Sequence, residues 1–394
     1  MHNKLTPKHA FLFAVTALAF VLVMQIRLPE PSAVVWLPIQ PQLNVLHYAH
    51  KDKGPAITAH AAILFENTTG TVLYGKNEHV RRSPASLTKI MTALLAFESG
   101  RMDDTVTISR RAAGLGGSSL YLKEGQQIPL RELMYGMLLR SGNDAAVAVA
   151  EHIAGSVSAF VGMMNQRADE LGATNTRFAN PHGLDAHNHY STAFDLTMLS
   201  RTALWHKDFA EIVGTVDHTY EEKGITWRNT NRLLWSYTGA EGIKTGTTGQ
   251  AGNCLAAAAS REGMQLITVV LGSANRWRDT TTLLDYGFDN FDKVVVAEKG
   301  ALLAQVSLPH GKQPLAIVPA RDIEVIVSDQ NSADISTQLH LAPIKLPIKK
   351  GAQIGTYEVY SGTATLASIP LRAANGVGRL TLWRMLTRWI TKRK

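Results

Sequence analysis

The chain has 394 residues, 45% of them hydrophobic and 18% charged, with seven tryptophans and a formal net charge of +8. This composition excludes an intrinsically disordered chain, and the length predicts two or three domains. The single cysteine, Cys254, excludes an internal disulfide and any metal site built from several cysteines. Residues 1–30 carry a net charge of +2 and residues 361–394 a net charge of +7, which leaves −1 on the rest of the chain. A nearly neutral body argues against nucleic acid as a partner, because phosphate binding needs lysines and arginines on the folded surface.

The N-terminal segment predicts export of the chain. Residues 10–26 form an uncharged apolar run after Lys4 and Lys8, a pattern typical of a secretory signal peptide or an uncleaved membrane anchor. The run is shorter than the ~20 residues of a spanning helix, which favours a signal peptide, whereas no clear Ala-x-Ala cleavage site follows it, which favours an anchor. Both interpretations stay open for residues 1–30, and residues 31–54 are predicted to be a linker.

Residues 55–295 are predicted to form one domain with an α+β fold. Apolar runs at 61–66 and 71–74 flank a Gly-containing turn and predict a β-hairpin. Helical patterns with glycine stop signals then cover roughly 83–205. Strand-like runs and a final helix follow at 215–221, 242–245, 253–259, 266–271 and 277–288. Strands on either side of a helical block predict a largely antiparallel sheet with an inserted helical subdomain, and an active cleft between the two.

The chain ends in a small predicted β domain and a basic tail. Residues 296–370 hold short β-rich runs separated by Pro and Gly, without a cluster of candidate catalytic residues. Residues 371–394 are predicted to hold an amphipathic helix. One side of its helical wheel is formed by Leu382, Trp383, Met385, Leu386, Trp389 and Ile390. Arg384 and Arg388 lie opposite, which suits a helix in the headgroup plane of a membrane surface. A helix docked on the protein and a solvated basic tail are the alternatives.

The first candidate catalytic motif is the single Ser-x-x-Lys of the chain, formed by Ser86 and Lys89. Ser83 can cap a helix and Pro84 can open its first turn, so Ser86 would lie near the positive end of that helix with Lys89 on the same face. A serine hydroxyl is a weak nucleophile until a base takes its proton. A lysine amine can do so when burial or a neighbouring positive charge lowers its pKa. An exposed lysine at a helix end is the ordinary alternative.

The second motif is Ser141-Gly142-Asn143, which follows a predicted helix end. The hydroxyl could transfer a proton, and the amide could hold both Lys89 and a substrate amide. Taken alone, a helix stop and cap is the more common explanation of such a tripeptide.

The third motif is Lys244-Thr245-Gly246, on a predicted strand. The lysine supplies positive charge, the threonine a donor for a carboxylate, and the glycine lets a substrate approach the backbone. Thr247 could add a backbone N–H that, with the N–H of Ser86, stabilises a developing oxyanion. An ordinary edge strand with a solubilising lysine is the alternative.

In this order the three motifs match the signature of β-lactamases and penicillin-binding proteins. Over roughly residues 55–290 the sequence resembles the D-alanyl-D-alanine carboxypeptidases, which are low-molecular-mass penicillin-binding proteins with an active-site serine. The resemblance is carried by segments such as RSPASLTKIMTALLAFESG, LLRSGNDAAVAVAEHIAGS and GIKTGTTGQAGNCLAAAAS. The later β region and the terminal helix are similar to that family's second domain and membrane anchor. The resemblance implies a penicillin-binding/β-lactamase-like fold, a place at the cell membrane facing the cell wall, and inhibition by β-lactams.

The resemblance also implies a reaction, the removal of the terminal D-alanine from a peptidoglycan stem peptide. Ser86 would attack the penultimate carbonyl and Lys89 would accept its proton, with Ser141 returning a proton to the departing D-alanine. Asn143 would orient the substrate, and water would release the acyl-enzyme. The terminal carboxylate would be held by Lys244 and Thr245.

Two features at the third motif bear on specificity. Thr247 and Gly249 fill positions where larger or acidic residues are more usual in the family. Arg276 and Arg278 could contact a carboxylate, although a surface position is the simpler expectation for each.

Three alternatives come from other classes of protein. A class A β-lactamase would need a Glu with a companion Asn to activate water, and no Glu-x-x-x-Asn follows Asn143. A zinc hydrolase could use the cluster His182, Asp185, His187 and His189, but HExxH is absent and a satisfied loop network is the better explanation. A membrane-tethered wall-binding protein with an inactive cleft is the third. We expect no metal and no cofactor.

Overall fold

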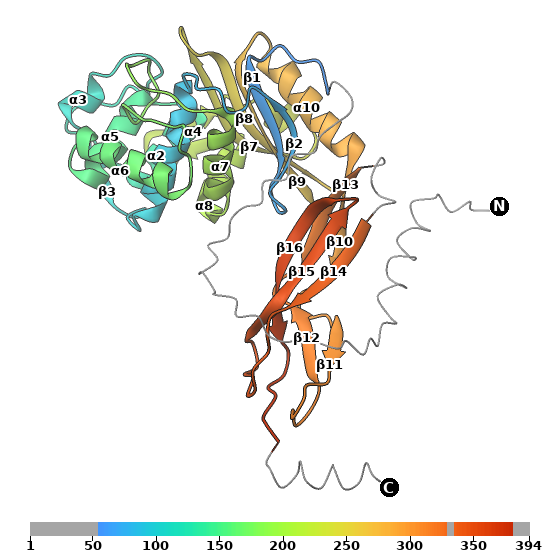
Figure 1. The fold of residues 1–394 in the computed structure, drawn as a ribbon. Coiled ribbons are helices and arrows are strands. Elements are labelled where there is room, and N and C mark those ends of the chain that lie inside the picture. The colour runs from blue at the N-terminus through green and yellow to red at the C-terminus, as the bar shows by residue number, and fades with distance from the viewer. Residues whose placement is uncertain (1–53, 329–334, 381–394) are drawn as a thin grey trace, which may run out of the picture. The chain divides into compact units, whose positions relative to one another are not determined.

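The structure is a computed structural model that describes residues 54–328 and 335–380. Within these residues the chain divides into two compact units, the first ending at Asn290 and the second starting at Phe291, and each is described by itself (Figure 1). The predicted signal or anchor segment and nearly all of the predicted linker lie outside the described residues.

The first unit is built on a five-stranded sheet in which every neighbouring pair is antiparallel, which confirms the predicted sheet. In spatial order its strands are β2 (Thr71–Lys76), β1 (Ala61–Glu66), β9 (Met264–Ser273), β8 (Gly252–Arg261) and β7 (Ala240–Thr248). Strand β8 is buried without interruption from Cys254 to Ala259. A strand buried on both faces needs helices on both faces, and the small alanine side chains let those helices pack closely. Strand β7 forms one edge of the sheet.

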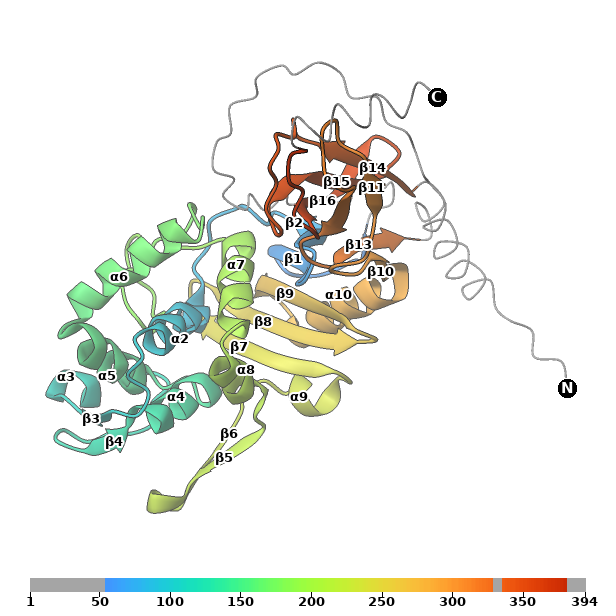
Figure 2. The same ribbon diagram turned by 90° about the horizontal axis from the view of Figure 1, so that it is seen from below.

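Helices cover both faces of this sheet (Figure 2). Helix α10 (Arg276–Asn290) packs on β8 and β9, and α7 (Ala193–Leu204) and α8 (Lys207–Gly214) pack on the opposite face. Gly287 allows α10 to come close, because a β-carbon there would lie 2.5 Å from Leu266 Cδ1. The sheet is therefore a rigid, fully covered support for its edge strand β7.

A helical subdomain is inserted between β2 and β7, as predicted. Before α7 it consists of η1 (Ala85–Thr88), α2 (Lys89–Glu98), β3 (Thr105–Thr107), α3 (Arg110–Ala113), β4 (Gln127–Pro129), α4 (Leu130–Leu139), α5 (Asn143–Ala154) and α6 (Val157–Glu170). The expected cap at Ser83 differs in the structure. The chain enters α2 through the 3₁₀ turn η1, no side chain caps that turn, and Ser83 Oγ instead donates to Asp185 at 3.1 Å.

One predicted strand belongs to a separate hairpin rather than to the main sheet. The segment predicted at 215–221 forms β5 (Asp217–Tyr220), which leads through η2 (Glu221–Lys223) to its partner β6 (Ile225–Arg228). Figure 2 shows this hairpin projecting from the unit below α9 (Leu233–Ser236) and α4. Alternating polarity indicates a strand but does not tell which strand it pairs with.

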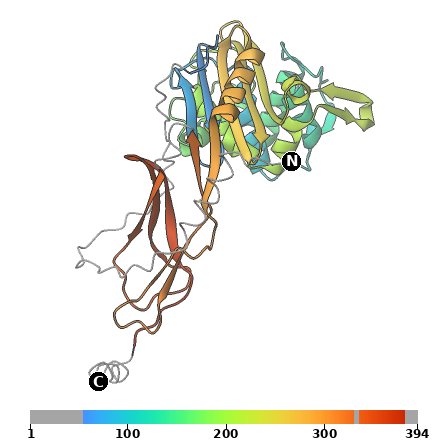
Figure 3. The ribbon, with the colours of Figure 1, turned by 90° about the vertical axis from the view of Figure 1, so that its right-hand side faces the viewer.

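The second unit contains two antiparallel sheets (Figure 3). Strands β10 (Phe291–Ala297) and β13 (Ile323–Ser328) form the smaller one. The larger has the order β11 (Ala304–Val306), β12 (Leu315–Pro319), β16 (Ala364–Ala373), β15 (Gln353–Ser361) and β14 (Ile335–Leu341). Its buried core includes Leu315, Ile317, Leu371 and Val377.

Part of the predicted terminal helix belongs to this β-rich unit instead. Residues 371–373 continue strand β16, and Val377 pairs with Ile348 and is fully buried. The rest of the predicted amphipathic helix, residues 381–394, lies outside the described residues. Across 54–328 and 335–380 no single helix is long and apolar enough to cross a bilayer, and only α5 and α6 together, with a bend of 85°, reach that length and hydropathy.

Candidate active site

Three segments of the first unit bring the motif residues together. Turn η1 packs directly against β7. Gly246 allows this contact, because a β-carbon there would lie 3.0 Å from Ser86 N and 3.1 Å from Ala85 Cβ. The predicted site residues are Ser86 in η1, Lys89 at the start of α2, Ser141 just before α5, Asn143 as the first residue of α5, and Lys244, Thr245, Gly246 and Thr247 on β7. The motifs therefore meet between the edge of the sheet and the helical subdomain.

Lys89 is fully buried and hydrogen-bonded on three sides. Its Nζ lies 3.1 Å from Ser86 Oγ, 2.8 Å from Asn143 Oδ1 and 2.6 Å from the carbonyl oxygen of His182. Burial, and then the nearby positive charge of Lys244, hold the pKa of Lys89 well below its ordinary value, against the opposing effect of Asp144. The surroundings of this amine therefore favour its neutral form.

The partners of Lys89 also set the direction of its lone pair. The carbonyl oxygen of His182 accepts only, and Asn143 Oδ1 accepts because the amide nitrogen of Asn143 donates to the Gly116 carbonyl oxygen at 2.9 Å. A neutral amine has two N–H groups, and these two acceptors use both. The lone pair is then left for the hydroxyl of Ser86.

Ser141 of the second motif has a strained backbone conformation. Its φ is +64°, in the left-handed region that non-glycine residues seldom adopt. Its Oγ is buried and has no hydrogen-bond partner within the described part of the chain. An unsatisfied buried hydroxyl on a strained backbone is typical of a group held in place for a substrate.

The third motif and Arg276 form a positively charged pocket. Lys244 is 1% exposed, and no carboxylate in residues 54–328 or 335–380 forms an ion pair with it. Burial, and then the charge of Arg276, lower the pKa of Lys244 to about 7. The hydroxyl of Thr245 lies 2.7 Å from that of Thr230 on the neighbouring loop. A buried lysine and a half-buried arginine, without an acidic partner among the described residues and beside a hydroxyl, form a site for an anion.

The position of Arg276 corrects the expectation of a surface arginine. Its Nη1 donates to the Gly246 carbonyl oxygen at 2.8 Å and to Thr247 Oγ1 at 2.9 Å. Arg276 opens α10 after β9, two strands away from β7, so only the strand order could have placed it here. Arg278 is exposed, as expected.

The segment from residue 179 to 189 contacts residues of the first motif. His189 Nδ1 accepts a hydrogen bond from Ala179 N at 2.9 Å, and its Nε2 lies 2.9 Å from Thr88 Oγ1. Burial lowers the pKa of His189 to about 4 and, with the charge of Lys89, that of His182 to about 3. Both rings are therefore neutral near pH 7. The sequence motifs did not single out Thr88, although it lies between the two catalytic candidates of the first motif.

Asp185 joins this segment to both sides of the cleft. It accepts hydrogen bonds from Ser83 Oγ at 3.1 Å, Thr248 Oγ1 at 2.6 Å and Gln250 N at 3.2 Å. Partial burial acts to raise its pKa, but these hydrogen bonds outweigh it and the pKa is lowered. The carboxylate thus ties the turn before Ser86 to the β7–β8 hairpin.

The zinc-hydrolase alternative has no support in this geometry. Both ring nitrogens of His189 are engaged by protein groups, which leaves neither for a metal ion. Among the described residues, no three His, Cys, Asp or Glu side chains lie close enough together to hold one. The segment is a hydrogen-bonded loop network, as the sequence suggested.

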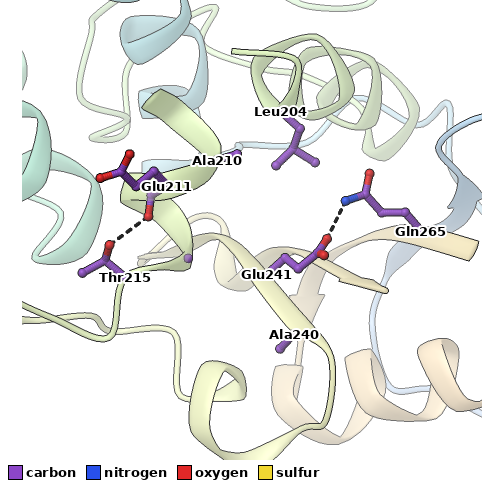
Figure 4. A pocket seen from close by; sticks show the side chains of 8 residues that line it. Leu204, Ala210, Glu211, Thr215, Ala240, Glu241 and Gln265 are labelled. Atoms are coloured by element: carbon purple, nitrogen blue, oxygen red, sulfur yellow. Dashed lines mark hydrogen bonds between the residues drawn. The ribbon is translucent and has the colours of Figure 1, made fainter. Parts of the chain in front are cut away.

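The first unit also has a hollow of about 460 Å³ (Figure 4). Its lining comes from α7, α8, β7 and β9 and includes Leu204, Glu211, Glu241 and Gln265. Glu241 accepts a hydrogen bond from Gln265, and none of the motif residues lines the hollow.

Two family models match the chain. Residues 48–275 match the model described as D-alanyl-D-alanine carboxypeptidase, and residues 291–379 match the C-terminal domain of penicillin-binding protein 5. The two matches fall on the two compact units of the structure.

Curated relatives cover most of the chain. The D-alanyl-D-alanine carboxypeptidase DacF of Bacillus subtilis is 36% identical over 329 residues, which are 80% of this chain and 85% of the relative. The D-alanyl-D-alanine carboxypeptidase DacD of Salmonella typhimurium is 34% identical over 91% of this chain and 96% of its own length.

Solved structures agree with both units. Penicillin binding protein 5 from Haemophilus influenzae has a TM-score of 0.75 and 32% identity, covering 83% of this chain and all of that one. The Streptomyces K15 DD-transpeptidase has a TM-score of 0.58 and 37% identity, covering 60% of this chain. The chain belongs to the D-alanyl-D-alanine carboxypeptidase family of serine peptidases, penicillin-binding hydrolases that act on the cell wall.

Proposed function

We propose that Ser86 is the nucleophile of this carboxypeptidase and Lys89 its base. The observation that carries the proposal is the set of three contacts around Lys89 Nζ, which leaves the lone pair of a neutral amine for the Ser86 hydroxyl. Ser86 Oγ attacks the carbonyl carbon of the penultimate D-alanine of a peptidoglycan stem pentapeptide, and its proton passes to Lys89. The negative charge on the carbonyl oxygen is stabilised by the backbone N–H groups of Ser86 and Thr247.

Ser141 returns the proton to the leaving group. The bond between the penultimate carbonyl and the terminal amide nitrogen breaks, and that nitrogen leaves as the amine of D-alanine after taking the proton of Ser141 Oγ. Lys89 then gives the proton that it took from Ser86 to Ser141 Oγ. This role is supported by the buried Ser141 hydroxyl, which has no protein partner within the described residues. Asn143 orients the substrate amide while it holds Lys89.

The terminal carboxylate binds at the positive pocket of the third motif. Lys244 and Arg276 supply charge, Thr245 supplies a hydroxyl donor, and Gly246 leaves room for the substrate beside β7. Water then attacks the ester on Ser86, which releases the shortened peptide and restores the hydroxyl. A β-lactam carries a carboxylate next to its reactive amide, so it takes the same place and acylates Ser86.

A fluorescent penicillin tests the assignment of the nucleophile. The parent protein is expected to be labelled covalently, with the adduct on Ser86 in mass spectrometry of its peptides. Ser86→Ala should abolish labelling, and Ser99→Ala, a serine at the far end of α2, should leave it unchanged. Labelling that survives Ser86→Ala, or an adduct on another residue, would contradict the proposal.

We also propose that the enzyme is exported through its N-terminal segment and held at the membrane, facing the cell wall, by residues 381–394. The basic and tryptophan-rich sequence of that tail supports membrane contact. A truncation that removes only this tail must keep Leu380. Leu380 N donates to the His310 carbonyl oxygen, and Val377 is a core residue of the second unit.

A variant ending at Leu380 tests the attachment. It is expected to lose binding to vesicles that contain anionic lipid and to keep full activity on a soluble peptide ending in D-Ala-D-Ala. Vesicle binding equal to that of the full chain would exclude the tail as the attachment.

A further inference from the structure

The residue before Ser86 is held in an unusual backbone conformation. Ala85 is fully buried and has a φ of +48°, a conformation that is unfavourable for a non-glycine residue and persists only where its surroundings impose it. Thr88 Oγ1 donates to the Ala85 carbonyl oxygen at 2.8 Å. Gly183 lies against the same oxygen, since a β-carbon on it would be 1.9 Å away. These two contacts fix the direction of the Ala85 carbonyl and therefore of the turn that carries Ser86.

The Thr88 hydroxyl is itself fixed by a histidine from a distant part of the chain. His189 Nδ1 accepts from Ala179 N, so the ring proton is on Nε2 and donates to Thr88 Oγ1. With its oxygen accepting from His189, the hydroxyl hydrogen points to Ala85. Thr88 is 0% exposed and His189 is 5% exposed, so water does not compete for these bonds.

The base is held by the same segment of chain. The His182 carbonyl oxygen accepts from Lys89 at 2.6 Å, and the Pro181 carbonyl oxygen accepts from Thr92 Oγ1, one turn further along α2, also at 2.6 Å. Residues 179–189 thus fix the turn of Ser86 through Thr88 and the amine of Lys89 directly. The 3.1 Å between the two reacting atoms depends on both contacts.

We propose that Thr88 and His189 are positioning residues for acylation. The hydrogen bonds from His189 to Thr88 and from Thr88 to the Ala85 carbonyl hold Ala85 in its left-handed conformation at the start of η1 and keep Ser86 Oγ within reach of Lys89. The inference rests on the proposed role of Ser86. A displacement of about 1 Å in such a pair can cost on the order of 100-fold in rate, so the effect is on chemistry more than on substrate binding.

The test uses three threonine variants of the full chain. Thr88→Val keeps the shape of the side chain and removes the hydroxyl, and Thr88→Ser restores the hydroxyl. Thr268→Val is the matched control, because Thr268 is also fully buried and its hydroxyl also donates to a backbone carbonyl oxygen, that of Ile63 at 2.9 Å. The measurements are the single-turnover rate of acylation by a fluorescent penicillin, its half-saturation concentration, and the midpoint of thermal unfolding.

Thr88→Val is expected to slow acylation about 10- to 100-fold while half-saturation changes less than about 3-fold, because the carboxylate pocket is untouched. Thr88→Ser should return the rate to within about 3-fold of the parent. Thr268→Val should lower the unfolding midpoint yet acylate at the parent rate.

Acylation by Thr88→Val at the parent rate, or no recovery in Thr88→Ser, would overturn the inference. A penicillin adduct of the parent on a residue other than Ser86 would instead overturn the proposed function. If Thr88→Val does not fold, His189→Gln, which keeps a donor, and His189→Met, which has none, give the same comparison. Only the methionine variant should then be slow, and equal rates in the two would overturn the inference.

Discussion

Acidification is expected to destabilise the enzyme through His189. Burial lowers the pKa of this histidine to about 4 in the folded protein, whereas an exposed histidine in the unfolded chain has a pKa of about 6.5. Between these two values the unfolded chain binds a proton that the folded protein does not bind. The free energy of unfolding therefore falls as the pH decreases from 6.5 to 4, and this contribution is constant above and below that window.

The size of the effect follows from the two pKa values. At about 1.4 kcal/mol for each factor of ten in proton affinity, the loss amounts to roughly 3 kcal/mol. The structural reason is that a protonated ring has no acceptor, so Ala179 N would lose the partner that it has at Nδ1. For a unit of this size, roughly 3 kcal/mol corresponds to about 6 to 12 °C in the midpoint of thermal unfolding.

The assay compares midpoints of thermal unfolding between pH 4 and pH 8 for three proteins. Carboxylates also titrate at the acid end of this range, so the informative quantity is the difference between the parent and His189→Gln. The glutamine can donate to Thr88 but does not titrate, so the variant should lose less stability than the parent between pH 6.5 and pH 4. His187→Gln, an exposed position of the same loop, should follow the parent. Parallel curves for the parent and His189→Gln would refute the reasoning.

Two predictions concern the cleft itself. Because burial and Arg276 lower the pKa of Lys244 to about 7, the amine loses its charge as the pH rises through 7, and kcat/KM for a substrate with a terminal carboxylate should fall above that pH. Lys244→Arg keeps the charge and should move this fall in kcat/KM to higher pH. A fall at the same pH in the variant would show that another group causes it. Gly246→Ala should slow acylation by penicillin on the order of 10- to 100-fold, because the new methyl group would lie 3.0 Å from Ser86 N. Gly249→Ala on the same hairpin is its control, since a β-carbon there meets nothing within 4 Å, and equal rates in the two variants would contradict the close contact.

The sequence allowed the sheet, the helical insertion and the three motifs to be predicted because each depends on short-range patterns. Ser86 and Lys89 are three residues apart where a helix begins, and that spacing places them on the same face. The buried run of β8 and the hairpin of β1 and β2 are equally local. The order of the motifs and their place between strands and helices then indicated the cleft.

The features that could not be predicted depend on long-range contacts. Arg276 reaches the third motif because β8 and β9 follow β7 across the sheet, and no local pattern fixes that order. Thr88 and His189 are separated by 101 residues, and neither the first motif nor the His/Asp cluster at 182–189 indicates that their side chains meet. Residues 371–373 were assigned to a helix rather than to a strand because the alternation of β16, which extends to Ala373, is interrupted by Pro370.

The contacts that residues 179–189 make with Lys89 and with the turn of Ser86 have a consequence for antibiotic resistance. Under the proposed mechanism, an antibiotic and the natural wall peptide both react with the Ser86 hydroxyl, and Lys89 is the base for both. A mutation in this loop that slows acylation by the drug should slow the removal of D-alanine from the wall peptide by a similar factor. Selection under treatment should therefore favour changes elsewhere, where the two molecules differ in shape or where the drug ester is hydrolysed.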